Sequence, residues 1–70
     1  MNGHRTIEAK IEGVDLQIEF TFTPCGEYTV EKNWLEGDRN ETDLWDLESA
    51  DVHRQVEHAC EQSLAQNGRL

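Results

Sequence analysis

The chain has 70 residues and a formal net charge of -9, from 15 acidic and 6 basic side chains. This length suits a single domain spanning 1–70. A chain this acidic is repelled by nucleic acid and by anionic lipid, because it has few cations to replace the counterions around phosphates. We therefore expect no direct nucleic-acid or membrane binding, and a preference for partners with basic surfaces.

Cysteine usage and hydropathy indicate the compartment. The chain has two cysteines, Cys25 and Cys60, whereas secreted domains of this size usually carry more and pair them. No apolar run follows the first residues, and no segment approaches the roughly 18 apolar residues of a membrane span. We expect reduced thiols and a cytoplasmic location.

Apolar and polar residues alternate along two segments, 6–12 and 15–22. A period of two is typical of half-buried strands. Gly13 lies between the segments, where a tight hairpin turn needs a positive φ. The side chains expected to face the core are Ile7, Ala9, Ile11, Leu16, Ile18, Phe20 and Phe22.

A β-turn follows at 23–26, where Pro24 presets φ and Gly26 ends the turn. A third strand is predicted at about 27–35. One face of this strand is expected to carry Tyr28, Val30 and Trp34. A polar loop at 36–41 comes next.

Residues 42–48 fit either a short fourth strand or a lead-in to a helix, and we favour the strand. Ser49 is a good helix N-cap, and Asn67 with Gly68 predicts the end of the helix. The apolar stripe of this helix consists of Val52, Val56, Ala59, Cys60 and Leu64. The sequence thus predicts an α+β fold, a three- or four-stranded antiparallel sheet with an N-terminal hairpin and one C-terminal amphipathic helix packed on one face.

No catalytic motif is complete. A thiol nucleophile at Cys25 has no histidine close in sequence. A metal site is another possibility, because His53, Glu57 and Glu61 lie on one side of the predicted helix. The zinc-protease pattern, however, needs a second histidine. We therefore expect neither enzymatic activity nor a resident metal or cofactor.

A calcium loop is also incomplete. The first three ligand positions of an EF-hand are matched by Asp38, Asn40 and Thr42. The sixth position is then Asp43 instead of glycine, and the twelfth is Ser49 instead of glutamate. The pattern fails at both positions, so the acids of this loop are better explained as a charged surface.

The acids are concentrated in one part of the chain. Residues 27–51 contain nine acids and two bases, and so carry seven of the nine net negative charges. Several acids form i, i+2 doublets: Glu36 with Asp38, Glu41 with Asp43, and Asp46 with Glu48. In an extended chain such pairs lie about 6.5–7 Å apart, close to the spacing of phosphates along a nucleic-acid strand. The array could imitate nucleic acid, or it could be a solvated edge that blocks strand pairing.

A resemblance follows from these features together. The chain has a glycine-turn hairpin, an aromatic-rich strand ending in Phe22-Thr23-Pro24-Cys25-Gly26, an acidic connector and a capped C-terminal helix. In this it resembles small acidic accessory proteins of bacteriophages and prophages, a group that includes anti-CRISPR proteins and other host inhibitors. The resemblance implies stoichiometric binding to a nucleic-acid-handling host protein or complex in the host cytoplasm.

The first functional hypothesis is therefore a non-enzymatic inhibitor that docks on a basic nucleic-acid-binding surface. The residues expected to bind the partner are Glu36, Asp38, Glu41, Asp43, Trp45, Asp46, Glu48 and Trp34. The alternative is a structural or assembly module in which a sheet edge or the helix mediates homodimerisation, and the acids serve solubility only.

Overall fold

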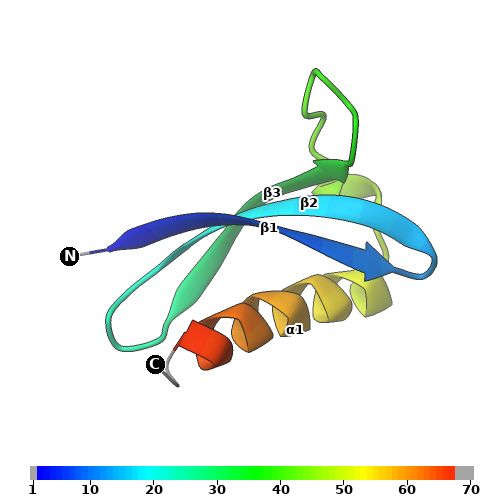
Figure 1. Ribbon diagram of the computed structural model, residues 1–70. Helices are drawn as coiled ribbons and strands as arrows, with labels where there is room; N and C mark the ends of the chain where they lie inside the picture. The colour runs from blue at the N-terminus through cyan, green and yellow to red at the C-terminus, as the bar shows by residue number, and fades with distance from the viewer. Residues whose placement is uncertain (1, 68–70) are drawn as a thin grey trace.

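The computed structural model describes residues 2–67, which form a three-stranded antiparallel sheet with one helix across one face (Figure 1). The elements in chain order are β1 (Gly3–Ile11), β2 (Val14–Phe22), β3 (Tyr28–Leu35), a 3-10 turn η1 (Trp45–Leu47) and α1 (Ala50–Asn67). The strand order is β1-β2-β3, so β1 and β3 are the edges of the sheet. This architecture confirms the predicted α+β fold.

The hairpin that joins β1 and β2 forms as predicted. Ile11 pairs with Val14, which leaves Glu12 and Gly13 as the two turn residues. Both have positive φ, 52° and 81°, as a type I′ turn requires. This turn matches the right-handed twist of the strands and sets their register.

One buried cluster forms between the sheet and α1. Its members are Ile11, Leu16, Ile18, Phe20, Val56 and Cys60. The alternating residues of β1 and β2 and the helical stripe of α1 thus meet in the core, as the sequence predicts. At the far end of the hairpin, the Phe22 ring lies over Gly3, where a Cβ would come within 2.4 Å of the ring.

Strand β3 contains a bulge that changes the direction of its later side chains. Glu19 pairs with Lys32 but Phe20 pairs with Val30, so Glu31 is the extra residue. Val30 packs against the core, whereas Trp34 pairs with Gln17 on the outer face of the sheet. The prediction that Trp34 shares a face with Tyr28 and Val30 is therefore wrong.

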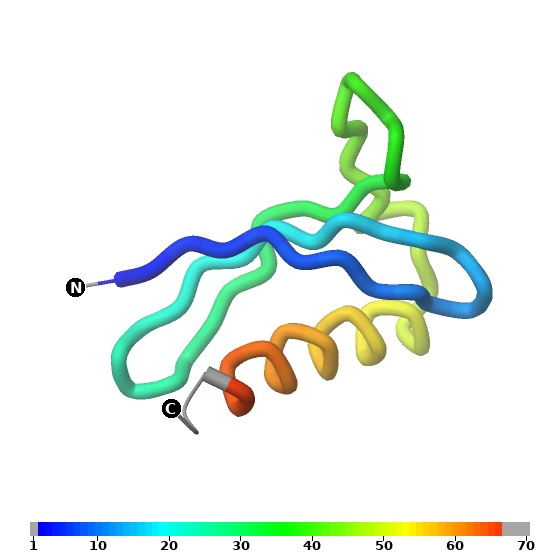
Figure 2. The backbone as a smooth tube through the Cα atoms, viewed as in Figure 1, coloured from blue at the N-terminus to red at the C-terminus, as the bar shows by residue number. Residues whose placement is uncertain are grey.

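The segment from 36 to 48 contains no fourth strand, so the strand that the sequence favoured at 42–48 is wrong. The segment projects from the sheet as a loop and returns through η1 (Figure 2). Asp43 Oδ1 accepts hydrogen bonds from the backbone N–H groups of Asn33 (3.2 Å) and Trp45 (3.1 Å). Glu41 has a φ of 51°. Local carboxylate bonds and this left-handed residue replace the pairing that a strand would need.

Helix α1 begins as predicted, because Ser49 Oγ accepts a hydrogen bond from Val52 N at 3.3 Å. The helix lies mainly against β1 and runs antiparallel to it. Near its start Gln55 donates to Glu12 (3.1 Å), and near its end the Arg5 guanidinium donates to Ser63 Oγ (2.8 Å). The predicted stop at Gly68 lies outside the described residues.

Candidate functional site

The predicted acidic site does not form a regular array. Residues 36–48 follow turns instead of an extended chain. The i, i+2 doublets therefore do not have the spacing that an extended strand would give them, and that spacing was the geometric basis for imitating phosphates. Glu36, Asp38, Glu41, Asp43 and Glu48 have distinct surroundings in the structure, and Asp46 is exposed in η1.

Two of the acids hold the loop together. Besides Asp43, Asp38 accepts hydrogen bonds from the backbone N–H groups of Asn40 (3.0 Å) and Thr42 (3.1 Å). These bonds favour the ionised form and lower the pKa of Asp38. The partial likeness to a calcium loop thus reflects a turn in which the Asp38 carboxylate accepts hydrogen bonds from the backbone N–H groups of Asn40 and Thr42.

Glu41 is paired with a cation. Its carboxylate lies 3.0 Å from Lys32 Nζ, and this hydrogen bond raises the pKa of Lys32. The same ammonium group lies 4.0 Å from a Glu19 carboxylate oxygen and 5.0 Å from the centroid of the Trp34 ring. Lys32 therefore neutralises part of the charge on the outer face of the sheet and covers Trp34.

Glu36 lies in the opposite environment. Its side chain forms a hydrogen bond with the Glu8 carboxyl group, and this bond, with repulsion from Glu8, raises the pKa of Glu36. Two carboxyl groups can share a hydrogen bond only when one of them is protonated. At neutral pH the pair brings negative charge from β1 and from the residue after β3 close together.

Neither tryptophan is a freely exposed anchor. Trp34 is only 7% exposed. Trp45 is half-buried, and its ring stacks on His53 with centroids 3.7 Å apart and an interplanar angle of 7°. His53 Nε2 also donates to the Trp45 carbonyl oxygen at 2.6 Å. The two rings therefore brace η1 against α1.

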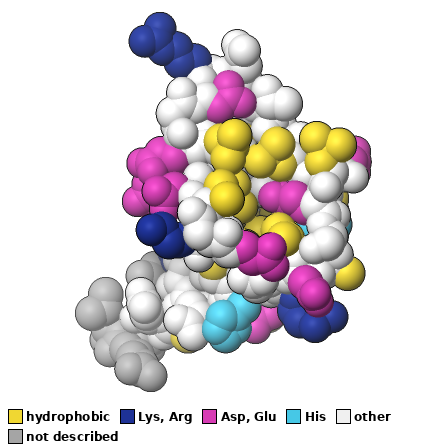
Figure 3. Space-filling view, turned by 90° about the vertical axis from the view of Figure 1, so that its right-hand side faces the viewer, with side chains coloured by type: hydrophobic (Ala, Val, Ile, Leu, Met, Phe, Trp, Pro, Cys, Tyr) yellow, Lys and Arg dark blue, Asp and Glu magenta, His cyan; other side chains and the backbone are white. Residues whose placement is uncertain are grey.

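An exposed apolar patch lies at the end of the molecule that carries the β1–β2 turn, and sequence reasoning missed it. Figure 3 shows hydrophobic side chains gathered on this face, with acidic side chains between and beside them. We define the apolar patch as the exposed Val14 (43%) and Leu35 (46%) with the half-buried Leu44 and Val52. These four residues line a shallow cavity of about 250 Å³. The only sequence signal was that Val14 and Leu35 are apolar at strand ends.

The edge of this cavity is acidic. Glu12 and Glu48 line it, and no lysine or arginine among residues 2–67 does. One carboxylate oxygen of Glu48 is buried and has no hydrogen-bond partner within residues 2–67. Leu47 is 83% exposed and lies in the adjoining turn, where its N–H group donates to Leu44 O. The site thus combines apolar surface with two carboxylates at its edge.

The residues weighed as metal ligands have other contacts. His53 stacks on Trp45, and Glu61 accepts a hydrogen bond from the Tyr28 hydroxyl at 2.6 Å. Burial, together with Glu61, raises the pKa of Tyr28. Across residues 2–67, no group of three or more His, Cys, Asp or Glu side chains is placed to hold a metal ion.

The two thiols have contrasting surroundings. Cys25 is exposed in the turn between β2 and β3, while Cys60 is buried in the core cluster, as predicted for a packing residue. Burial, with the nearby Glu57 and Glu61 carboxylates, raises the pKa of Cys60 to about 11. Its thiol is therefore protonated at neutral pH and is a poor nucleophile.

Comparison with known proteins gives no relative. The chain matches no protein-family model, and no curated protein or solved structure matches it significantly. In the part of the chain that the structure describes, no helix has the length and apolar character needed to cross a bilayer. The function must therefore be inferred from the site itself.

Proposed function

We propose that this chain is a non-enzymatic binding protein that docks through the apolar patch and its acidic edge on a basic surface of another protein. The observation that carries the proposal is the patch itself, where Val14 and Leu35 are exposed beside Glu12 and Glu48. Exposed apolar groups supply affinity when a partner covers them. Carboxylates around them favour partners with Lys or Arg at matching positions.

The class of partner follows from the charge. A net charge of -9 on 70 residues creates a field that attracts basic surfaces and speeds encounter with them. Proteins that handle nucleic acid present such surfaces, so a nucleic-acid-handling host protein or complex is the partner we propose. In this role the chain acts stoichiometrically, as an inhibitor of the phage accessory type does, by covering a site that nucleic acid or another protein would use.

The test begins with capture of partners from bacterial lysate by the tagged chain, with release by a salt step and identification by mass spectrometry. We expect a basic protein that elutes at moderate salt, because exposed charges are screened beyond about 10 Å at 0.1 M salt. Retention of the partner through high salt would show that charge contributes little to binding.

Variants then locate the surface. Val14→Thr with Leu35→Thr places β-branched threonine, which suits a strand, at both positions and removes apolar area. Glu12→Gln with Glu48→Gln removes the acidic edge. Each pair should weaken binding about ten-fold or more. The matched control is Glu27→Gln with Glu31→Gln, which removes equal charge from exposed positions that do not line the cavity. Equal binding by all three variants would contradict the proposal.

These variants do not include a reversal of charge at Asp43. Its carboxylate bonds the backbone of Asn33 and Trp45, so a change there would disturb the loop and confuse loss of folding with loss of contact.

A further inference from the structure

The outer edge of β1 is open. Within residues 2–67, β1 pairs only with β2, and its nine residues contain neither a bulge nor a proline. Its backbone donors and acceptors on the far side are therefore free to pair with another strand. A second strand could extend the sheet there without breaking any existing ladder.

The other edge of the sheet is protected. Strand β3 carries the bulge at Glu31, and acids lie along and beyond it at Glu27 and Glu36. Bulges and charged residues are the usual means by which proteins block edge pairing. Since β1 lacks the bulge, the two edges differ in their capacity to accept a strand.

The charge of β1 also differs from the rest of the molecule. Its charged residues at neutral pH are Arg5, Glu8 and Lys10, so the strand is slightly basic in a chain of net charge -9. Two copies of an acidic chain repel each other over most of their surfaces. The β1 edge is where two copies can approach with the least repulsion.

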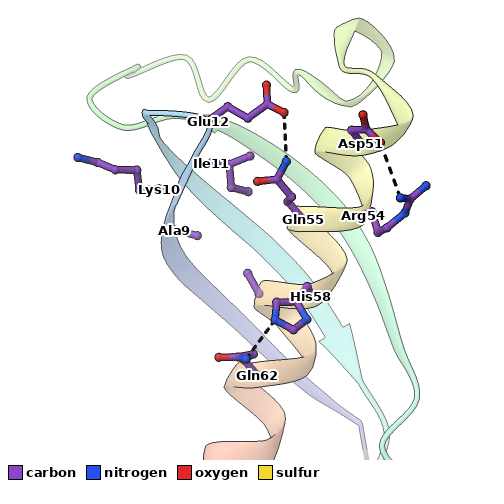
Figure 4. A pocket seen from close by; sticks show the side chains of 10 residues that line it. Ala9, Lys10, Ile11, Glu12, Asp51, Arg54, Gln55, His58 and Gln62 are labelled. Carbon is purple, nitrogen blue, oxygen red and sulfur yellow. Dashed lines mark hydrogen bonds and ion pairs between the residues drawn. The ribbon is translucent and has the colours of Figure 1, made fainter.

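A groove follows this edge on the helix side. Figure 4 shows it between β1, with Ala9 and Ile11, and α1, with Gln55, His58 and Gln62. Its volume is about 620 Å³, and a smaller hollow lined by Ile7 and Ser63 continues it. Small side chains line both sides of the groove, Ala9 on β1 and Ala59 on α1, and Lys10 also lines it, with its side chain extending outward (Figure 4).

We propose that the occupant of this edge is a second copy of the chain, paired antiparallel through β1 about a two-fold axis at Ala9. The result is a six-stranded sheet with both α1 helices on one face. In this register Glu8 lies opposite Lys10 of the partner subunit, and by symmetry the pair occurs twice. Ile7 likewise lies opposite Ile11 of the partner subunit on the helix side.

The charge pattern of β1 selects this register. An axis at Glu8 would place two Glu8 carboxylates opposite each other, and an axis at Ile7 would place Glu8 opposite Thr6, so that neither Glu8–Lys10 pair forms. Like charges directly opposite each other destabilise strand pairs, and opposite charges contribute about 0.2–1 kcal/mol each. A slip by one residue would put the two helices on opposite faces and leave both grooves empty.

The positions of the two α1 helices are compatible with the same two-fold axis. The Gln55–Glu12 and Arg5–Ser63 hydrogen bonds tie the two ends of α1 to β1, which places Ala59 alongside Ala9. A small residue at this point lets two helices approach closely. Gln55 then faces Gln62 of the partner subunit, and each amide carries both donors and an acceptor for the other.

The experiment measures molar mass by sedimentation equilibrium over a concentration series. The wild type is expected to approach twice the monomer mass. Glu8→Lys and Lys10→Glu should each weaken the dimer about ten-fold or more, since each replaces two opposite-charge pairs with two like-charge pairs. Both changed positions are exposed, and circular dichroism checks that each variant is folded.

Mixing the two single variants provides the decisive control. A Glu8→Lys chain paired with a Lys10→Glu chain regains both opposite-charge contacts, so the mixture should dimerise more tightly than either variant alone. Glu31→Lys changes the net charge as much as Glu8→Lys but lies on β3, and it should not weaken the dimer. A wild type that stays monomeric to about 1 mM, as expected if the edge serves another protein's peptide, would overturn the proposal. Unchanged dimerisation of the single variants would also overturn it.

Discussion

Asn33 is the most unusual residue of the core. It lies on the helix side of β3 opposite Ile18, and its side chain is 0% exposed. Its backbone is satisfied, because the N–H group donates to Asp43 and the carbonyl accepts from Leu44. The side-chain amide, however, has no partner for either its nitrogen or its oxygen within residues 2–67.

Replacing this amide should stabilise the fold. A buried polar group without a hydrogen bond costs about 1–3 kcal/mol. Asn33→Val keeps the backbone bonds, suits a strand and removes both unpaired atoms, so we expect the free energy of unfolding to rise by about 1–2 kcal/mol. Urea denaturation followed by tryptophan fluorescence measures the change.

The control at this position is Asn33→Asp, which has nearly the same shape but buries a carboxyl group. It should lower the free energy of unfolding. If the valine variant were instead less stable than the wild type, Asn33 would have to hold bonds that its present geometry lacks.

Among the elements, the β1–β2 turn has a residue that suits it poorly. Glu12 has a φ of 52°, a conformation that disfavours most residues other than Gly, Asn and Asp. Asn-Gly is the preferred pair for a type I′ turn. Glu12→Asn should therefore raise the free energy of unfolding by about 0.5–1 kcal/mol, measured by thermal or urea denaturation.

Gly13 gives the matched comparison. A Cβ at Gly13 would meet nothing within 4 Å, yet its φ is 81°. Gly13→Ala should lower the free energy of unfolding by about 1 kcal/mol through backbone strain alone. A neutral effect of this change would mean that the turn adopts another type.

The elements also differ in how far the sequence predicts them. In strands β1 and β2 and in helix α1, the spacing of apolar residues within the element itself predicts its structure. All three elements form as expected. The bulge in β3 depends on how its residues pair with β2, and the loop after it depends on Asp43, whose bonds reach back to Asn33. Such non-local contacts leave no periodic signal, so the sequence pattern predicts the wrong face for Trp34 and a strand at residues 42–48.

For the whole molecule, the sequence predicted the acidic character of the candidate site but not its shape. Composition places most of the negative charge in residues 27–51. It does not reveal that Asp38 and Asp43 accept hydrogen bonds from the backbone, or that Glu41 forms an ion pair with Lys32. The apolar patch arises only when strand pairing brings Val14 near Leu35 and when α1 adds Val52. Residues from four segments must assemble before the surface exists.

The proposed dimer would give this surface a further property. Because the two β1 strands run antiparallel, the two β1–β2 turns point in opposite directions. Each turn borders an apolar patch, so the two patches would lie on opposite sides of the two-fold axis. A dimer would thus offer two equal sites, and avidity would follow only for partners that can reach both.

The excess of acids also sets how stability depends on pH. The pKa of Glu36 is raised above its ordinary value of 4.5, mainly by the hydrogen bond to Glu8. The stabilisation linked to its protonation is fully present below pH 4.5 and is lost as the pH rises through the raised pKa. Glu36→Gln removes the repulsion, so it should raise the melting temperature at pH 7, and the difference should shrink on acidification through that pKa.

The pH dependence of stability that is linked to Asp38 has the opposite sign. Its pKa is lowered from 3.8 by the backbone hydrogen bonds from Thr42 and Asn40, so its contribution is present above pH 3.8 and is lost as the pH falls through the lowered value. Asp38→Asn should therefore lower the melting temperature at pH 7 and approach the wild type in acid. Calorimetric scans from pH 7 to pH 3 compare the two variants.

If Glu36→Gln lowered the melting temperature at pH 7, the Glu36 side chain would have to make a favourable contact that outweighs the repulsion from Glu8.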